Sequence, residues 1–330
     1  MFTEQSLHDQ PALVKALMGL DATEFWTLIQ QMTEHLPAYT QQQRHRPDRQ
    51  RAPGAGRPPD LPLALRTALV LTYLRLHIPQ ATVAALFAGA TQADVSRDLR
   101  RVLPLIQQCL PCPAVWEEVA DAAPDAPYSF LSADDLTDGR VLIDATEQPV
   151  ARPVNPVQQK AYYSGKQQDH TLKTQIVTDG EHHIQAISVA VPGARHDKAL
   201  SDDLHTLDRL PDGCEADADK GYQGLAAAVP WVRVRNTATG AEQAVPRLRV
   251  QTPFKKPKGG QLSAEQKAFN AALGRLRVRV EHCIGWAKNW AILATRFRCA
   301  HPIYTAIMCT VCGFVNVQTQ RWQAAKANCV

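Results

Sequence analysis

The chain has 330 residues, of which 45% are hydrophobic, a composition that suits a globular protein with one large domain or two ordinary ones. Its formal charge of +4 is small, so contact with nucleic acid would depend on local groups of Lys and Arg. No stretch approaches the ~18 consecutive apolar residues of a membrane-spanning helix, and MFTEQSLHDQ at the N-terminus is not a signal peptide. We therefore expect a soluble, cytoplasmic protein with no membrane partner.

Eight cysteines are too few for a disulfide framework in a chain of this size, and we expect free thiols. Two pairs have metal-ligand spacing: Cys109 and Cys112 in CLPC, and Cys309 and Cys312 in CTVC. Four thiolates brought together would suit zinc. The alternative is packing, because the apolar run AIMCTVCGFV places the second pair on one helix face.

The N-terminal segment, residues 1–40, has a helical pattern at PALVKALMGL and again from Asp21, where Glu24 completes a capping-box spacing before FWTLIQQMTEHL. Residues 41–60 are rich in Gln, Arg, Pro and Gly, which predicts a basic linker. This linker is either a solvated spacer or a strand that follows DNA phosphates.

Residues 61–112 have the pattern of a helix-turn-helix. Apolar residues at helical spacing in LPLALRTALVLTYLRL precede ATVAALF, the turn AGAT and a third segment, QADVSRDLRRVLPLI. In such a unit the third helix reads DNA. Its polar residues are Gln92, Asp94, Ser96, Arg97, Arg100 and Arg101. The turn is one residue longer than the commonest form, and an ordinary three-helix packing unit is the alternative.

Residues 135–325 change from strand patterns to helical ones, which predicts a mixed α/β domain. GRVLIDATEQPV, HTLKTQIVTD, HHIQAISVAV, CEADAD and LRVQTPF have strand patterns, and Asp179-Gly180 joins two of them in a hairpin. Helices are expected at HDKALSDDLHTLDRL and from Ser263 to Trp290.

Three acidic residues stand out in this domain. Asp144 is expected at the end of the strand VLID, Asp219 at the end of CEADAD, and Glu281 in the long helix. Carboxylates from two strands and a helix can converge, and hard oxygen ligands suit Mg²⁺ or Mn²⁺. A pair of such ions can drive phosphodiester cleavage. Each acid taken singly is more often an ordinary surface carboxylate.

The chain contains the strings YYSGKQQDHTLKTQIVTD, VPGARHDKAL, ADKGYQG, PFKKPKG and AFNAALGRLRVRVEHCIGWAKNWAIL. In these strings it resembles the transposases of bacterial insertion sequences related to insertion sequence five, whose superfamily includes the Harbinger elements. The resemblance implies a ribonuclease-H-like catalytic domain in which Asp144, Asp219 and Glu281 hold two metal ions. Gly274 departs from the family, which commonly has a tyrosine or another polar residue there. Asp217 and the His196-Asp197 pair are candidates for groups behind the metal ligands, and Tyr222 is expected to pack behind the loop.

Basic residues lie near these acids in the sequence, where a phosphate backbone would approach. The residues predicted to bind DNA are Arg97, Arg100, Arg101, Lys166, Lys173, Lys255, Lys256, Arg277 and Lys288. Lys160, Lys258 and Arg279 extend the clusters. For a single lysine, a solvated surface position is the alternative.

The resemblance implies a nucleoid-associated enzyme that binds terminal inverted repeats, cleaves phosphodiester bonds and transfers 3′-OH ends to target DNA. Two ends must be held together, so we expect a homodimer or a higher oligomer on DNA. Two alternatives stay open at this point: a captured transposase that acts only as a DNA-binding regulator, and a metal-dependent nuclease that cuts without joining.

Overall fold

The computed structural model describes residues 1–45, 59–118, 130–235 and 241–327. The chain divides into two compact units. Unit 1 comprises Met1–Cys112 and Ala287–Phe314, and unit 2 comprises Pro113–Trp286 and Val315–Val330. Among the described residues, no helix has the length and apolar character needed to cross a bilayer.

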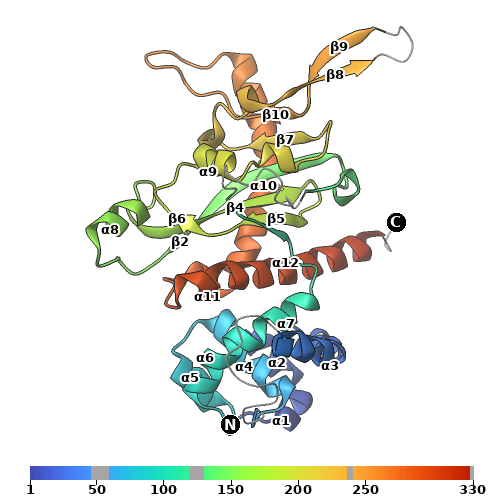
Figure 1. Ribbon diagram of the computed structural model, residues 1–330, viewed down its shortest axis with the longest axis vertical. Coiled ribbons are helices and arrows are strands. Elements are labelled where there is room, and N and C mark those ends of the chain that lie inside the picture. The colour runs from blue at the N-terminus through green and yellow to red at the C-terminus, as the bar shows by residue number, and fades with distance from the viewer. Residues whose placement is uncertain (46–58, 119–129, 236–240, 328–330) are drawn as a thin grey trace. The chain divides into compact units, whose positions relative to one another are not determined.

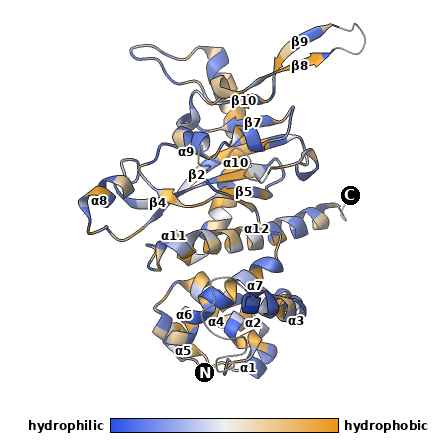
Figure 2. Cartoon of the chain, in the orientation of Figure 1, coloured by the Kyte–Doolittle hydropathy of each residue, from blue (hydrophilic) through white to orange (hydrophobic). Residues whose placement is uncertain are grey.

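Unit 1 is helical (Figure 1). Its elements are α1 (Glu4–Asp9), α2 (Pro11–Met18), α3 (Ala22–His45), α4 (Leu63–Leu76), α5 (Gln80–Leu86), α6 (Gln92–Arg101), α7 (Leu103–Gln108), α11 (Ala291–Ala294), a 3₁₀ turn at His301–Ile303, and the first part of α12 (Tyr304–Ala327). Nearly every residue of α4 is buried, so this helix forms the centre of the unit. Helix α12 contains both hydrophobic and hydrophilic residues, as Figure 2 shows.

Helix α3 confirms the predicted capping box. The backbone N–H of Glu24 donates to the Asp21 carboxylate at 2.8 Å, and the Asp21 N–H donates to Glu24 at 2.7 Å. The helix is longer than expected, because it continues through Pro37 to His45. Residues 41–45 of the predicted linker are therefore helical, and its arginine-rich part, 46–58, lies outside the described residues.

The segment after the AGAT turn forms two helices, where the sequence pattern predicted one. A capping box between Thr91 and Asp94 begins α6, which ends at Arg101. Pro104 explains the break at Val102, because proline has no N–H to donate to the carbonyl four residues earlier. The turn from Phe87 to Thr91 separates α5 from α6 as predicted, so this region has the expected order of helices.

Unit 2 has a mixed eight-stranded sheet (Figure 1). Its strands are β1 (Ala114–Trp116), β2 (Arg140–Pro149), β3 (Tyr163–Ser164), β4 (Asp169–Asp179), β5 (Ile184–Ser188), β6 (Val191–Pro192), β7 (Glu215–Ala218) and β10 (Arg249–Gln251). The main order is β1-β5-β4-β2-β7-β10, and β3 and β6 pair with β4. Strand β2 is antiparallel to β4 and parallel to β7, so it joins the two halves of the sheet.

The remaining elements of unit 2 are helices, 3₁₀ turns and a separate ribbon. They are a 3₁₀ turn at Ala133–Asp135, α8 (Pro156–Tyr162), α9 (Asp197–Asp203), 3₁₀ turns at Leu207–Arg209, Lys220–Tyr222 and Ala226–Ala228, the antiparallel ribbon β8 (Trp231–Arg235) and β9 (Glu242–Pro246), α10 (Ala264–Lys288) and the last part of α12. The sequence patterns did not predict the ribbon, because its side chains are largely exposed and it has no buried face.

The core of unit 2 follows from strand alternation. Val141 and Ile143 of β2 are fully buried in a cluster with residues of β4, β5, β7 and α9. Helix α12 is fixed to β5 by Asn316, whose side chain accepts from the Ile184 N–H at 2.8 Å and donates to its carbonyl at 2.9 Å. The predicted hairpin at Asp179-Gly180 is confirmed, because Asp179 accepts from the N–H groups of Glu181 and His183.

The candidate active site

Asp144 lies in the middle of β2, and not at the strand end that the sequence predicted. The strand continues to Pro149 because its pairing with β4 is unbroken over that length. The side chain is 16% exposed, and its Oδ1 accepts from the Ala145 N–H at 2.8 Å. Asp144 is thus held by the centre of the sheet.

Asp219 reaches the same place from the neighbouring strand. β7 is parallel to β2, and Ala218 is the register partner of Ile143. Asp144 directly follows Ile143, and Asp219 directly follows Ala218. Because these two partners lie in adjacent parallel strands, the carboxylates that follow them lie side by side. The Asp219 carbonyl accepts from the Tyr222 N–H at 3.0 Å, which closes the 3₁₀ turn that follows the strand.

Helix α10 adds Arg277 and Glu281. One terminal nitrogen of Arg277 lies 3.1 Å from Asp144 Oδ2, and the other lies 3.0 Å from Asp219 Oδ1. Glu281, one helical turn later, has its Oε1 3.8 Å from the same guanidinium. The three predicted acids therefore converge on a single cation, whose side chain is only 10% exposed.

The electrostatics of the site reflect this crowding. Burial raises the pKa of Asp144, and the nearby Asp219 raises it further, whereas Arg277 and Lys166 act in the opposite direction. Tyr222 is fully buried, and its hydroxyl has no hydrogen-bond partner among the residues that the structure describes. Burial and the carboxylates of Asp197, Asp144 and Asp219 raise the pKa of this hydroxyl, so it stays protonated. Negative charge in the site is concentrated and only partly neutralised.

The donor chemistry decides whether a divalent metal ion suits these residues. Among the described residues, no three His, Cys, Asp or Glu side chains are arranged as a metal-binding group, and in this site Arg277 lies between the acids. The donors are carboxylate oxygens, which a divalent ion prefers, so the side chains of Asp144, Asp219 and Glu281 are of the type that suits such an ion.

The guanidinium of Arg277 is directed at the three acids, and the residue is 9% exposed. The contact with DNA predicted for Arg277 stays a prediction. Lys166, Lys255, Lys256 and Lys288 are exposed, and Lys166 is near enough to Asp144 to lower its pKa. Gly274 has open space beside it, so nothing in the described part of the chain fills the position of the family's larger residue.

Lys173 is buried, and the contact with DNA predicted for it stays a prediction. Its Nζ donates to Asp197 Oδ1 at 2.7 Å and to the Arg195 carbonyl at 2.6 Å. Glu147, its register partner on β2, lies 3.6 Å away. Glu147 was not among the predicted residues. Its signal in the sequence was an acidic residue in one predicted strand and a basic residue in another.

Asp217 is separate from the carboxylate group. It is fully buried, and Arg140 binds it together with Glu215, two residues earlier on β7. Burial raises the pKa of Asp217, and the ion pair with Arg140 opposes that shift. Through this ion pair, Asp217 connects Arg140, the first residue of β2, to β7.

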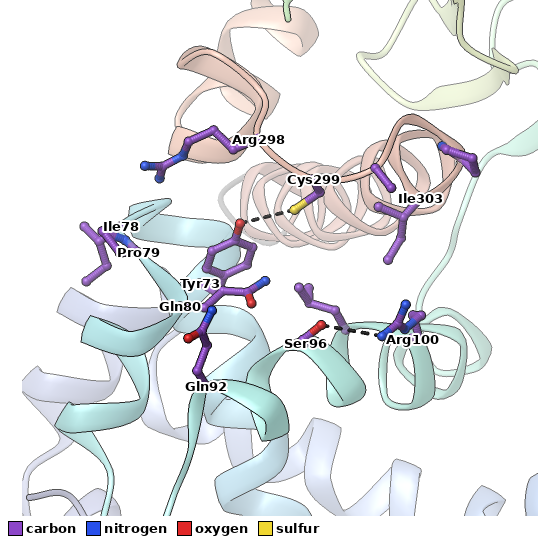
Figure 3. Close-up of a pocket in the computed structure, with 13 residues that line it drawn as sticks. Tyr73, Ile78, Pro79, Gln80, Gln92, Ser96, Arg100, Arg298, Cys299 and Ile303 are labelled. Carbon is purple, nitrogen blue, oxygen red and sulfur yellow. Dashed lines mark hydrogen bonds between the residues drawn. The ribbon is translucent and has the colours of Figure 1, made fainter. Parts of the chain in front are cut away.

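In unit 1, the polar residues of α6 lie on two sides of the helix. Gln92, Ser96 and Arg100 line a cavity of about 520 Å³ that Tyr73 and Arg298 also line (Figure 3). Arg97 is half exposed on another side and pairs with Asp94 at 2.9 Å. The polar side chains of this helix thus lie on two of its surfaces.

The cysteine motifs also meet within unit 1. Cys112 is hydrogen-bonded to Cys309 and lies near Cys312, and this bond together with burial raises the pKa of the Cys112 thiol. Cys109 instead donates to the Leu105 carbonyl at 3.4 Å. The four-thiolate zinc site does not form among the described residues, and Cys309 and Cys312 pack as a buried helix face.

Two aspartates on adjacent strands and a glutamate on a helix thus form one carboxylate group in unit 2. Comparison with known proteins gives the family of the chain. The model of the DDE superfamily endonucleases matches residues 143–316, which contain all three acids, and the chain belongs to this family.

The chain is also 32% identical over 182 residues to a probable transposase for insertion sequence element IS702 from Microchaete diplosiphon. That match covers 54% of the chain and 56% of the relative, so it spans little more than half of either protein. No solved structure gives a significant match. The predicted DDE-type family is confirmed, whereas the narrower group related to insertion sequence five stays a prediction.

Proposed function

We propose that the chain is a DNA transposase that binds the terminal inverted repeats of its element, cleaves phosphodiester bonds and transfers the 3′-OH ends to target DNA. The observation that carries the proposal is the convergence of Asp144, Asp219 and Glu281 on one guanidinium within the DDE endonuclease region. The strand order β5-β4-β2-β7-β10, antiparallel then parallel, supports a ribonuclease-H-like fold for this region.

The three acids would hold divalent metal ions, most simply two Mg²⁺ ions with Mn²⁺ as a substitute. When bound, such ions activate a water or a DNA hydroxyl and stabilise the leaving oxygen. Asp144 and Asp219 supply carboxylates that the paired strands hold in place. Glu281 supplies a carboxylate that is 55% exposed and so accessible from solvent.

The basic residues would bring the phosphate backbone to these acids. Lys166 is exposed in the turn that leads into β4, on the side of Asp144, and Lys255 and Lys256 lie exposed between β10 and α10. A row of ammonium groups attracts phosphates without reading sequence. Lys288 ends α10 and would add to this set.

End recognition would lie in unit 1. We assign it to a helix-turn-helix of α4 to α6, with Arg97, Arg100 and Arg101 on α6 as contacts to DNA. A functional complex must hold two DNA ends, which requires at least a homodimer on DNA. Such an enzyme would work in the bacterial cytoplasm, on the nucleoid.

The test is a cleavage and strand-transfer assay on DNA that carries the flanking repeats, with Mg²⁺ or Mn²⁺. The native protein should cut and join the ends, and Asp219→Asn should do neither while still binding DNA. Cutting without joining would favour a nuclease. Binding without cutting by the native protein would favour a DNA-binding regulator and overturn the proposal.

A further inference from the structure

A buried ion-pair network lies directly behind the turn that carries Asp219. Lys173 of β4 is its centre, with Asp197 and Glu147 as its two acidic neighbours. The three side chains are 8%, 19% and 6% exposed, respectively. Thr171 donates to the second oxygen of Glu147 at 2.8 Å, so this carboxylate is bonded on both sides. Buried charges are costly to separate, which makes the network rigid.

Asp197 connects the network to the turn. It is the first residue of α9, and its Oδ1 accepts from Lys173. Its other oxygen, Oδ2, lies so close to Gly221 that a Cβ at that glycine would be 2.2 Å away. Any side chain at position 221 would therefore strike a carboxylate that Lys173 prevents from moving. Glycine is required here to make room for Asp197.

The turn itself links Gly221 to the candidate metal ligand. Asp219, Lys220, Gly221 and Tyr222 form one 3₁₀ turn, closed by the bond from the Tyr222 N–H to the Asp219 carbonyl. Tyr222 is fully buried beneath it. The turn is thus packed from below by Tyr222 and from the side by Asp197, and its only carboxylate points to Arg277.

We propose that Asp197, fixed by Lys173, is a positioning residue: its carboxylate rests on Gly221 and sets the location of the Asp219 carboxylate. This inference rests on the proposed function, since it gives Asp219 a role as a metal ligand. It also explains why HDK and DKGYQG, which lie more than twenty residues apart in the sequence, belong to one site.

The decisive experiment is a double-mutant cycle. Gly221→Ala forces a methyl group against Asp197, whereas Asp197→Ala removes the obstacle. We expect each single variant to weaken Mn²⁺ binding, Gly221→Ala by about 10- to 100-fold, the range typical for groups that orient metal ligands. The double variant should bind Mn²⁺ more tightly than Gly221→Ala alone. Free Mn²⁺ is measured by electron paramagnetic resonance on the full chain.

A second measurement does not depend on metal. Amide hydrogen exchange of the turn, residues 219–224, should be faster in Lys173→Met and Asp197→Asn than in the native protein, with α12 unchanged. Asp202→Asn is the matched control, because it is the same chemical change on the same helix, at an exposed residue paired with Lys198. That variant should exchange and bind Mn²⁺ as the native protein does.

Two results would overturn the positioning role: additive effects in the cycle, or unchanged exchange in the turn when Asp197 or Lys173 is replaced. Failure of the positioning role can be distinguished from failure of the proposed transposase function. Native protein that binds Mn²⁺ but neither cuts nor joins DNA would end the transposase proposal and leave the positioning role standing. Native protein without Mn²⁺ binding would end the metal-ligand role of Asp219, and exchange would then decide whether Asp197 fixes the turn.

Discussion

The acids of the candidate site come from two regions of unit 2 that hold them very differently. Asp144 and Asp219 follow register-paired positions in adjacent parallel strands, and their side chains are 16% and 31% exposed. Glu281 projects from α10, is 55% exposed and lies 3.8 Å from the shared guanidinium. The sheet provides a rigid half of the site, and the helix provides an adaptable half.

The two halves also differ in how unfavourable the ionisation of their carboxyl groups is. Burial makes ionised Asp144 unfavourable, and the protein offsets this with Arg277, which the helix supplies. Glu281 is solvated and pays little for its charge. Arg277 is therefore the element that joins the two halves, and replacing it should have the largest effect on the metal-free protein.

Arg277→Met should destabilise the metal-free protein by roughly 3 kcal/mol, because it leaves Asp144 and Asp219 without their cation. Urea unfolding in the presence of a chelator measures the loss. Mn²⁺ should restore most of it, since a divalent ion replaces the missing charge. An unchanged free energy of unfolding would show that Arg277 does not hold the two halves together.

Asp144→Asn should stabilise the metal-free protein at neutral pH. The folded-state pKa of Asp144 is raised above its ordinary 3.8, so its ionisation weakens the fold as the pH rises through that raised pKa. Below pH 3.8 the acid is protonated in both the folded and unfolded states, and the advantage of the variant should vanish. Thermal unfolding from pH 3 to 8 measures this, and a variant less stable than native protein at pH 7 would contradict the account.

Glu281→Gln should change the stability of the metal-free protein by no more than about 1 kcal/mol, because a half-exposed ion pair contributes little. It should nevertheless abolish metal-dependent cleavage. Chemical denaturation paired with the cleavage assay separates the two effects. A large loss of stability would mean that the helix half is as rigid as the sheet half.

Lys166→Met and Lys173→Met should differ in their effect on DNA binding. Removing the exposed Lys166 should reduce the slope of log affinity against log salt by about 1, as expected for one lost phosphate contact. Removing the buried Lys173 should leave that slope unchanged. DNA binding measured at several salt concentrations distinguishes the two variants. An equal reduction of the slope in both would support the direct DNA contact predicted for Lys173.

Much of this site could be predicted from the sequence, for a physical reason. The alternation of VLIDAT and the glycine turn after Asp219 are local patterns, and they located strands β2 and β7. The long helix of Glu281 was also evident from its periodicity. What local patterns do not contain is register, and register decides that Asp144 lies within β2 and that Glu147 faces Lys173.

The burial of charged residues was also not predictable from local sequence patterns. A lysine in a strand and an arginine on a helix have the same local signature whether they face solvent or carboxylates, so Lys173 and Arg277 were both predicted to contact DNA. The break between α6 and α7 was, by contrast, available from Pro104. The ribbon of β8 and β9 was not predicted, although Val and Arg alternate in WVRVR, the sequence of β8.

The measurement that tests the central claim most directly is a Mn²⁺ titration of the native protein beside Asp144→Asn, Asp219→Asn and Glu281→Gln, followed by thermal stability and electron paramagnetic resonance. If the three acids form one metal site, the native protein binds Mn²⁺ and is stabilised by it, and each variant loses affinity, whereas Asp202→Asn does not. Native affinity in all three variants would show that the convergence on Arg277 is a structural ion-pair group and not a catalytic centre.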